Sequence, residues 1–569
     1  MSAQRRMSGS EIIARALRQE GVADVFALAG DHVLPVMNTM AEQDFRFWDT
    51  RHEQAAVHMA DAWARITGQM GVSMVTTPGH ANALPGLVHA MHTEAPVLHI
   101  SGSDKLSNYD RGMMQEIDQV AMAKAVTKGA WLVHDARRIP NYIALAVRAA
   151  FAGRRGPVSL TIPIDVQEQL VDERDVRFQA PAVASARRPV GAMPEQARAA
   201  VRLLHGAKQP IVIAASPAAY HESATPVLAA FIETTRLPLL TEGSARGVVP
   251  DDHPYCFGFF DATLNRAASL LREADVVLLL GKKIDYTIAY GQPPAIAAGA
   301  KIIQIDPSAT EIGKNRDVEV GIAGDVAGVV EQMTAEARSL AWHDLPWLAR
   351  FRAERAAQEE WVASKAIPES PAHPLFVHQT VGKFIGRDDV VVFDGGDYCH
   401  FGKLYHASLR RGKWWALPHL GMLGSAIPTA LAAQIAFPKA RVAMMTGDGA
   451  FGFNGMEFDT AVRHRLHIVG VVGNDSAWGI DRRIQVTAYG HAVATDLLPT
   501  RYDKIVEGLG GHAEHVDSPE LLESALRRAF DAGKPALVNV AIQGVASPRG
   551  ERAIARRKAE VEEAAHGHR

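Results

Sequence analysis

Three side chains with oxygen donors follow two apolar segments and could together bind a divalent cation. Asp448 lies in Gly447-Asp448-Gly449, directly after the apolar run 442–445, and Asn474 and Asp475 follow the run 468–472. Carboxylate and amide oxygens are the ligands that Mg²⁺ and Ca²⁺ prefer, and such a cation can also hold a diphosphate. Because glycine lets the main chain approach phosphate oxygens closely, the pattern predicts a metal–diphosphate site.

The elements around these residues predict how they come together. Both apolar runs are expected to be strands, and Met456, Phe458, Ala461 and Val462 recur at near-helical spacing between them. A strand–helix–strand unit with parallel strands places the tips of both strands at one edge of the sheet. A Gly-Asp-Gly tripeptide alone is usually an ordinary turn, so the frame and the spacing carry the prediction.

With Asn474-Asp475 at this distance, the segment resembles the thiamine diphosphate motif of the family that contains acetolactate synthases, pyruvate decarboxylases and 2-hydroxyacyl-CoA lyases. The resemblance implies Mg²⁺ (or Ca²⁺) bound by Asp448, by Asp475 or Asn474, and by the carbonyl of Ala477. The family usually has Asn-Asn at the second tip, so the choice between Asn474 and Asp475 stays open. The cofactor contacts it implies here are Gly447, Asp448, Gly449, Ala450, Asn474, Ala477 and Trp478.

Size and composition limit the class of protein. The chain has 569 residues, 47% of them hydrophobic and 22% charged, with a net charge of −3. Such a length favours several domains, and the charge balance gives no reason to expect nucleic acid or a membrane as partner. Two cysteines cannot form a disulfide framework, residues 1–10 lack a signal-peptide pattern, and no segment reaches membrane-spanning length. We therefore expect a cytoplasmic enzyme.

Alternating helix and strand patterns predict an α/β fold of three doubly wound parallel-sheet domains. By resemblance, these are a pyrimidine-binding domain over 1–185, a central Rossmann-like domain over 190–350 and a diphosphate-binding domain over 370–569. A linker is expected at 181–194, and a helical connector at 340–370.

Glu53 is the candidate activating residue of the first domain. It follows an expected strand at 45–48 and precedes an expected helix at 54–67, where the helix dipole alone would favour a carboxylate. The string RHEQAAVHMADAWAR, however, resembles the RHEQ(A/G)A segment of the family, in which the Glu hydrogen-bonds N1′ of the aminopyrimidine and favours its imino tautomer. That role requires a carboxylate that shares a proton in a dry site.

Other expected loop tips supply further candidates. TTPGHANALPG (76–86) resembles the GPG-x-x-N loop of the family, which implies that Pro78 and Asn82 contact the cofactor. Asp31, His32 and His80 are candidates for proton transfer, although a loop histidine is more often only solvated. Residues 111–128 resemble an FQE segment, which places Gln115 at the substrate. The remaining histidines of this region, His58, His89, His92 and His99, are expected to be structural.

The central and last domains contribute weaker signals. The central strands at 211–214, 276–280 and 301–305 lack a GxGxxG, so FAD, ADP, coenzyme A and a purely structural role all remain open. Gly396 and Asp397 follow the expected strand 390–393 and should face the diphosphate. Residues 419–436 resemble the family segment in which the Gly421 carbonyl accepts from the cofactor and Leu423 wedges between its rings.

These observations favour a carboligase or decarboxylase that resembles acetolactate synthase and acts on a 2-oxo acid. The alternative is a 2-hydroxyacyl-CoA lyase or a related acyl-CoA decarboxylase, and the remote one is a silent cofactor-binding scaffold. The charged tail 547–569 is expected to be a solvated helix or a frayed end, or else a lid with basic groups for a coenzyme A phosphate. The resemblance implies a homodimer at least and favours a homotetramer.

Overall fold

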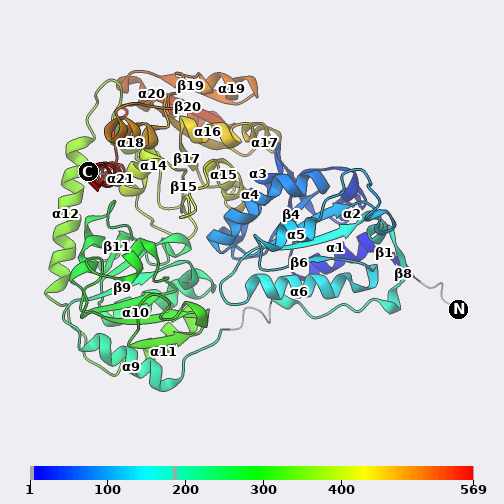
Figure 1. The fold of residues 1–569 in the computed structure, drawn as a ribbon, viewed down its shortest axis with the longest axis horizontal. Coiled ribbons are helices and arrows are strands. Elements are labelled where there is room, and N and C mark those ends of the chain that lie inside the picture. The colour runs from blue at the N-terminus through cyan, green and yellow to red at the C-terminus, as the bar shows by residue number, and fades with distance from the viewer. Residues whose placement is uncertain (1–4, 184–188, 568–569) are drawn as a thin grey trace. The chain divides into compact units, whose positions relative to one another are not determined.

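The computed structural model describes residues 5–183 and 189–567, and three six-stranded parallel sheets organise this part of the chain (Figure 1). By packing, the chain divides into two compact units. The first unit combines residues up to 188 with 418–438 and 456–464, and the second holds 189–417, 439–455 and 465 onward. The core of the predicted linker, 184–188, lies outside the described residues, as do residues 1–4 and the end of the tail.

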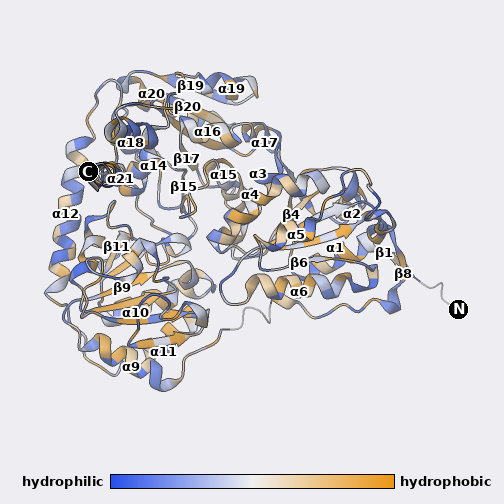
Figure 2. Cartoon of the chain, in the orientation of Figure 1, coloured by the Kyte–Doolittle hydropathy of each residue, from blue (hydrophilic) through white to orange (hydrophobic). Residues whose placement is uncertain are grey.

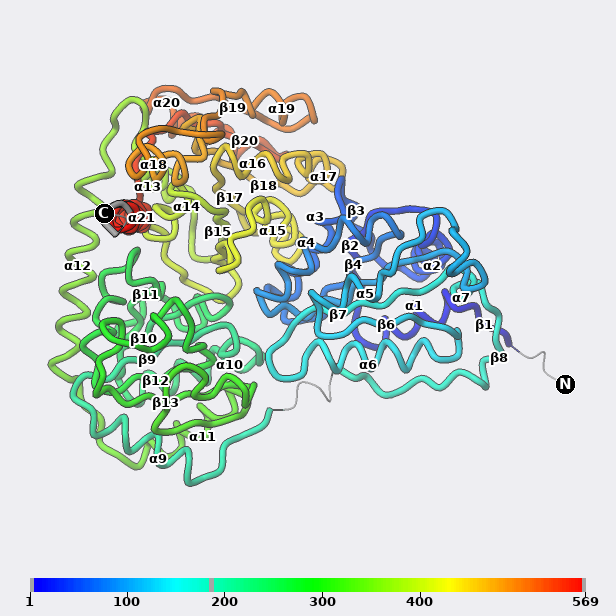
Figure 3. The backbone as a smooth tube through the Cα atoms, viewed as in Figure 1, coloured from blue at the N-terminus to red at the C-terminus, as the bar shows by residue number. Residues whose placement is uncertain are grey.

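The first unit contains the sheet β3-β2-β4-β5-β7-β6. Its strands are β2 (Asp24–Ala27), β3 (Arg46–Asp49), β4 (Gly71–Val75), β5 (Val97–Ser103), β6 (Ala130–Leu132) and β7 (Val158–Pro163). The helices with most bearing on the site are α3 (Glu53–Thr67), α4 (Thr77–Thr93), α5 (Gln119–Lys124), α15 (Ala426–Ala436) and α17 (Glu457–Arg463). Figure 3 shows α15 beside α3, and α17 packs against α15, although both come late in the chain. Helices α1 (Gly9–Gln19), α2 (Leu34–Ala41) and α6 (Ile139–Phe151) complete the packing.

The second unit contains two sheets. The central sheet β11-β10-β9-β12-β13-β14 is built from β9 (Pro210–Ala214), β10 (Leu239–Thr241), β11 (Cys256–Phe259), β12 (Val276–Leu280), β13 (Lys301–Asp306) and β14 (Val320–Ala323). The last sheet β16-β15-β17-β18-β20-β19 is built from β15 (Val390–Phe393), β16 (Trp414–Ala416), β17 (Val442–Gly447), β18 (Ile468–Asn474), β19 (His512–Val516) and β20 (Ala536–Ala541). Its surrounding helices include α13 (Pro374–Gly382), α14 (Asp397–Tyr405), α16 (Asp448–Asn454), α18 (Gly479–Tyr489) and α21 (Pro548–Gly567), whereas the buried start of α12 (Trp347–Lys365) packs in the core of the central sheet.

The strand orders confirm the predicted doubly wound fold. The first and last sheets follow the same strand order. In each, the strand that comes first in the chain lies between the second and the third, so the switch point of the fold lies between the first and third strands of the chain. The central sheet has the third-second-first-fourth-fifth-sixth order typical of a Rossmann fold. Parallel strands are covered on both faces, which explains wholly buried runs such as Val390–Phe393. Figure 2 shows that the strands are apolar, whereas α12 is largely hydrophilic.

Two local predictions are wrong. The segment 76–86 is not a loop, because α4 begins at Thr77 with Pro78 in its first turn, where proline is favoured. The amphipathic helix expected after Gly449 is two helices, since α16 ends at Asn454, Gly455 caps it, and α17 begins only at Glu457. Met456, expected on the apolar face, is 52% exposed.

No helix within the described residues is both long and apolar enough to cross a membrane.

Candidate cofactor site

Glu53 is the first residue of α3 and is held by α4. It is 8% exposed, and Nδ2 of the exposed Asn82 donates to its Oε2 at 3.1 Å. A Cβ atom at Gly79 would lie only 2.9 Å from Oε1 of Glu53. Only glycine therefore leaves room for this carboxylate, and the sequence-predicted Glu53 and Asn82 are in contact.

The turn that precedes Glu53 is fixed by α17. Oε1 of Glu457 accepts hydrogen bonds from the main-chain N–H groups of Arg51 and His52, both at 3.1 Å. Thr460 Oγ1 donates to the second oxygen of Glu457 at 2.6 Å. Burial raises the pKa of Glu457, whereas these hydrogen bonds act in the opposite direction. Sequence reasoning did not identify this carboxylate, because it lies about 400 positions from the turn that it binds.

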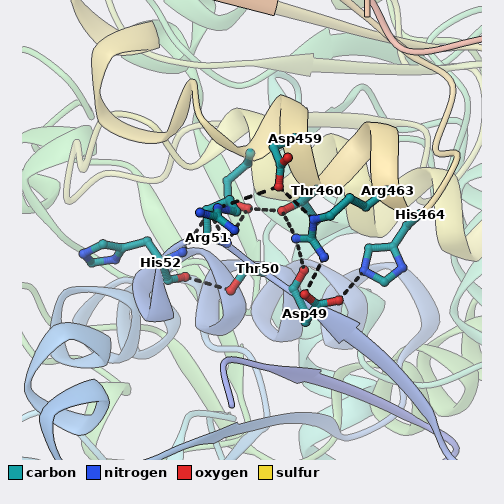
Figure 4. Close-up of polar contacts among 9 residues, drawn as sticks. Asp49, Thr50, Arg51, His52, Asp459, Thr460, Arg463 and His464 are labelled. Atoms are coloured by element: carbon teal, nitrogen blue, oxygen red, sulfur yellow. Dashed lines mark hydrogen bonds and ion pairs between the residues drawn. The ribbon is translucent and has the colours of Figure 1, made fainter. Parts of the chain in front are cut away.

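A second set of contacts ties the same turn to α17 (Figure 4). Arg463 forms an ion pair with the carboxylate of Asp49, and Nη2 of Arg463 donates to the Asp49 carbonyl at 2.9 Å. Nε2 of His464 lies 2.8 Å from the other carboxylate oxygen of Asp49. Asp49 ends β3, so α17 holds both the strand end and the turn that presents Glu53.

His32 lies where the strand order reverses, between the ends of β2 and β4. This position is where open α/β sheets bind ligands. Its Nδ1 lies 3.1 Å from Thr76 Oγ1 and 3.0 Å from Thr77 Oγ1, and the side chain is 5% exposed. The neighbouring Asp31 is exposed.

His80 is fully buried and forms a relay with His99. Nδ1 of His80 lies 3.2 Å from Nε2 of His99, whose Nδ1 lies 2.9 Å from Ser73 Oγ. Burial lowers the pKa of His80 to about 4, although the main chain of Gln119 raises it in part, and burial and His80 lower that of His99. Both rings are therefore neutral at pH 7. Nε2 of His80 has no hydrogen bond of normal geometry within the described part of the chain.

The structure identifies Gln119, rather than Gln115, as the buried glutamine of this region. Gln119 Nε2 donates to Thr77 Oγ1 at 3.1 Å and to the Gly102 carbonyl at 3.0 Å, and its Oε1 accepts from the hydroxyl of Ser101. Gln115 is exposed and adopts a left-handed conformation at φ 63°. It is not brought to Glu53 within the first unit, so its substrate role stays a prediction.

In the second unit, β17 and β18 place the acidic tips side by side. The two strands pair in parallel with Gly447 opposite Gly473, and Asp448 Oδ2 accepts from the Ala477 N–H at 3.1 Å. Burial and the nearby Asp475 raise the pKa of Asp448 to about 7, and burial raises that of Asp475. A buried carboxylate whose charge is disfavoured by burial and by a neighbouring half-buried carboxylate is the donor chemistry that a divalent cation relieves.

The amide of the neighbouring Asn474 is engaged in internal hydrogen bonds. Its Oδ1 accepts from the Ser476 N–H at 3.1 Å, and its Nδ2 donates to the Thr500 carbonyl at 3.1 Å. No group of three His, Cys, Asp or Glu side chains in the described chain has metal-binding geometry. A cation here would therefore take further oxygens from the main chain, water or the diphosphate besides those of Asp448 and Asp475.

Glycines leave space at the ends of two adjacent strands of the last sheet. A Cβ atom at Gly396, after β15, or at Gly447, at the end of β17, would meet no atom within 4 Å. A Cβ at Gly449 would lie 2.7 Å from the ring of Trp478, so this ring packs directly on the Gly-Asp-Gly turn. Space for phosphate oxygens beside the buried Asp448 and the half-buried Asp475 fits a metal-bound diphosphate. Ala450 is buried in α16, in the turn that follows.

Asp397, predicted to face the diphosphate, forms internal contacts. Its Oδ1 accepts from the N–H and the hydroxyl of Ser547, at 3.0 and 2.5 Å, and its Oδ2 pairs with Arg483. Ser547 directly precedes α21, so the predicted tail is a helix whose start is anchored rather than frayed.

The remaining predicted positions lie elsewhere. Gly421 and Leu423 precede α15 in the first unit, where Gly421 has φ 74° and Leu423 is half-buried.

At the switch point of the central sheet, the buried Lys282 binds Glu242 at 3.1 Å and Asp285 at 3.2 Å. The nucleotide prediction for this domain stays untested.

The three parallel sheets and the acidic strand tips define a cofactor-dependent α/β enzyme. Three family profiles match the chain: the N-terminal TPP binding domain of thiamine pyrophosphate enzymes over residues 7–122, the central domain over 197–333 and the C-terminal TPP binding domain over 394–540. The chain therefore belongs to the thiamine pyrophosphate (thiamine diphosphate) enzyme family.

Curated relatives fall into two groups. A probable acetolactate synthase of Mycobacterium bovis is 32% identical over 548 residues, which cover 95% of this chain and 97% of the relative. The 2-hydroxyacyl-CoA lyase 2 of Homo sapiens is 30% identical over 579 residues, which cover 94% of this chain and 90% of the relative. The 2-hydroxyacyl-CoA lyase 1 of Mus musculus is 31% identical over 562 residues, with 95% and 94% covered. This protein is thus an enzyme related to acetolactate synthases and 2-hydroxyacyl-CoA lyases.

Proposed function

We propose that this protein is a Mg²⁺- and thiamine diphosphate-dependent carboligase or decarboxylase that acts on a 2-oxo acid. The observation that carries the proposal is the buried Glu53 carboxylate, oriented by Asn82 and given room by Gly79. The match along 95% of the chain to a relative named as a probable acetolactate synthase supports the substrate class.

One set of residues is proposed to bind the cation and the other to control protons at the cofactor and the substrate. When bound, the cofactor supplies an electron sink at its thiazolium ring. Glu53 holds a proton at the aminopyrimidine, and His32 and His80 are candidates for proton transfer to and from substrate. Asp448, Asp475 and the Ala477 carbonyl would hold the cation, since the Asn474 amide already bonds to Thr500 and Ser476.

A second candidate is cleavage of a 2-hydroxyacyl-CoA. Several relatives at 30–31% identity carry that name, and the long α21 presents exposed basic side chains, among them Arg552 and Arg556. Those side chains could bind a coenzyme A phosphate. In either case, Glu53 and Asp448 belong to different units, and by resemblance to the family we propose a homodimer or homotetramer in which they serve one cofactor.

The test is turnover by the loaded protein with pyruvate and with a 2-hydroxyacyl-CoA in parallel. Acetolactate formed from pyruvate and lost in Glu53→Gln supports the carboligase. An aldehyde or ketone together with formyl-CoA identifies the lyase instead. Glu42→Gln is the matched control, because Glu42 is an exposed carboxylate at the end of α2. Equal turnover by wild type and Glu53→Gln contradicts the proposed role of Glu53.

A further inference from the structure

Arg483 of α18 binds two carboxylates that come from different strand ends of the last sheet. Nη2 of Arg483 pairs with Asp397, after β15, and Nη1 lies 3.4 Å from Oδ2 of Asp475, after β18. The side chains of Arg483, Asp475 and Asp397 are only 18%, 14% and 4% exposed. The three groups therefore form a partly desolvated ionic triad, in which water screens the charges weakly.

The triad lies beside the proposed cation site. Asp475 is itself a proposed cation ligand, Asp448 accepts from the N–H of Ala477, two residues after Asp475, and Arg483 joins Asp475 to Asp397. Nearby, Arg549 pairs with Asp261 at 2.9 Å, and burial lowers the pKa of His400 to about 4. Within the described residues, Arg483 is the positive side chain that forms ion pairs with Asp397 and Asp475.

Gly479 provides the space that the contact between Asp475 and Arg483 requires. A Cβ atom at Gly479 would lie 2.7 Å from Oδ2 of Asp475 and 2.7 Å from Nη2 of Arg483. Any other residue at 479 would push these two side chains apart. Nε of Arg483 is buried without a partner among the described residues, so the guanidinium is held by the two carboxylates alone.

We propose that Arg483 is a built-in competitor for the Asp475 carboxylate and thereby sets the affinity of the cation site. The inference rests on the proposed function, which assigns Asp475 as a cation ligand. A guanidinium and a divalent cation cannot both take the same carboxylate oxygens at full strength. Arg483 weakens binding of the bare cation and compensates the acidic charge that Asp475 and Asp397 add to the site.

The experiment measures Mn²⁺ binding to the full-length protein without cofactor, from the loss of the free-Mn²⁺ paramagnetic resonance signal. Loss of a charge-assisted contact of about 1.4 kcal/mol corresponds to about a tenfold change in affinity. We therefore expect Arg483→Met to lower the Kd for Mn²⁺ about tenfold. In the Asp475→Asn background, where Arg483 keeps its ion pair with Asp397 but has no carboxylate at 475 to compete for, we expect the Arg483 substitution to change the Kd less than about twofold.

Two further variants serve as controls for the Mn²⁺ binding experiment. Arg482→Met is the matched control, because Arg482 is an adjacent, more exposed arginine that pairs with Asp496 at 2.6 Å. Arg483→Gln, which removes the charge but keeps a polar side chain, should shift the Kd in the same direction as Arg483→Met, which guards against failure of Arg483→Met to fold.

The possible results separate the claims. Unchanged or weaker Mn²⁺ binding in Arg483→Met, or equal tightening in both backgrounds, overturns the inference and leaves the proposed function standing. No stoichiometric Mn²⁺ binding in any variant overturns the cation site and the inference together.

Discussion

The carboxylate of Glu457 binds the main-chain N–H of His52 at 3.1 Å across 405 positions of sequence. This contact fixes the turn that delivers Glu53 to the start of α3. A residue of the late helix α17 thus shapes the place where the proposed activating carboxylate is held. The first unit is therefore built from segments that lie far apart in the chain.

Replacing Glu457 with alanine should destabilise the protein and misplace Glu53. The N–H groups of Arg51 and His52 would lose their acceptor in a partly buried site, at a cost of about 2 kcal/mol of unfolding free energy. Urea denaturation measures this loss, and cofactor titration measures the effect on the site. Glu457→Gln keeps one carbonyl acceptor and should lose less. Equal stability of wild type and Glu457→Ala would contradict the structural role.

Removing the Asn82 amide should slow activation without abolishing cofactor binding. Asn82→Ala frees Oε2 of Glu53, whereas Asn82→Asp places a like charge 3.1 Å from it. We expect about a tenfold loss of kcat for alanine, equivalent to about 1.4 kcal/mol, and a larger loss for aspartate. Steady-state kinetics on the three proteins checks the order, and a more active aspartate variant would refute it.

A methyl group at Gly449 should disturb the diphosphate turn. Its Cβ would lie 2.7 Å from the Trp478 ring, so Gly449→Ala must move that ring or the turn. We expect weaker cofactor binding, measured by quenching of tryptophan fluorescence. Gly452→Ala in the same helix meets no atom within 4 Å and should bind cofactor normally, with stability equal or up to about 1 kcal/mol higher.

Acid should destabilise the protein through its buried histidines. His378 of α13 is fully buried, its Nε2 lies 2.8 Å from the Tyr398 carbonyl, and burial lowers its pKa to about 4. The unfolded state, with a histidine pKa near 6.5, binds more protons between about pH 6.5 and pH 4. Stability is therefore full above about pH 6.5 and falls as the pH drops through this window.

Each such histidine contributes a slope of up to about 1.4 kcal/mol per pH unit. Urea midpoints at pH 7, 6 and 5 should fall for the wild type, and less steeply for His378→Gln. Identical slopes for the two proteins would show that His378 binds its proton as readily in the folded state as in the unfolded state, which would contradict the lowered pKa.

How much the sequence revealed depends on the range of each interaction. Uniformly apolar runs identified strands such as β15 to the residue, since a parallel strand is buried on both faces. The Glu457 contact, the His80–His99 relay and the Gln119 network were not predicted, because side chains on separate elements meet without a local pattern. Asp397 was assigned to the diphosphate from its place after β15, but its partners Arg483 and Ser547 are 86 and 150 positions away.

The most direct test of the central claim is exchange of the C2 proton of bound thiamine diphosphate, followed by ¹H NMR in D₂O after acid quench. If Glu53 controls the aminopyrimidine proton, exchange should be fast in the wild type and in Glu42→Gln. In Glu53→Gln it should be at least about a hundredfold slower, at cofactor concentrations that saturate every protein. Equally fast exchange in Glu53→Gln would contradict the assignment of Glu53 as the activating residue.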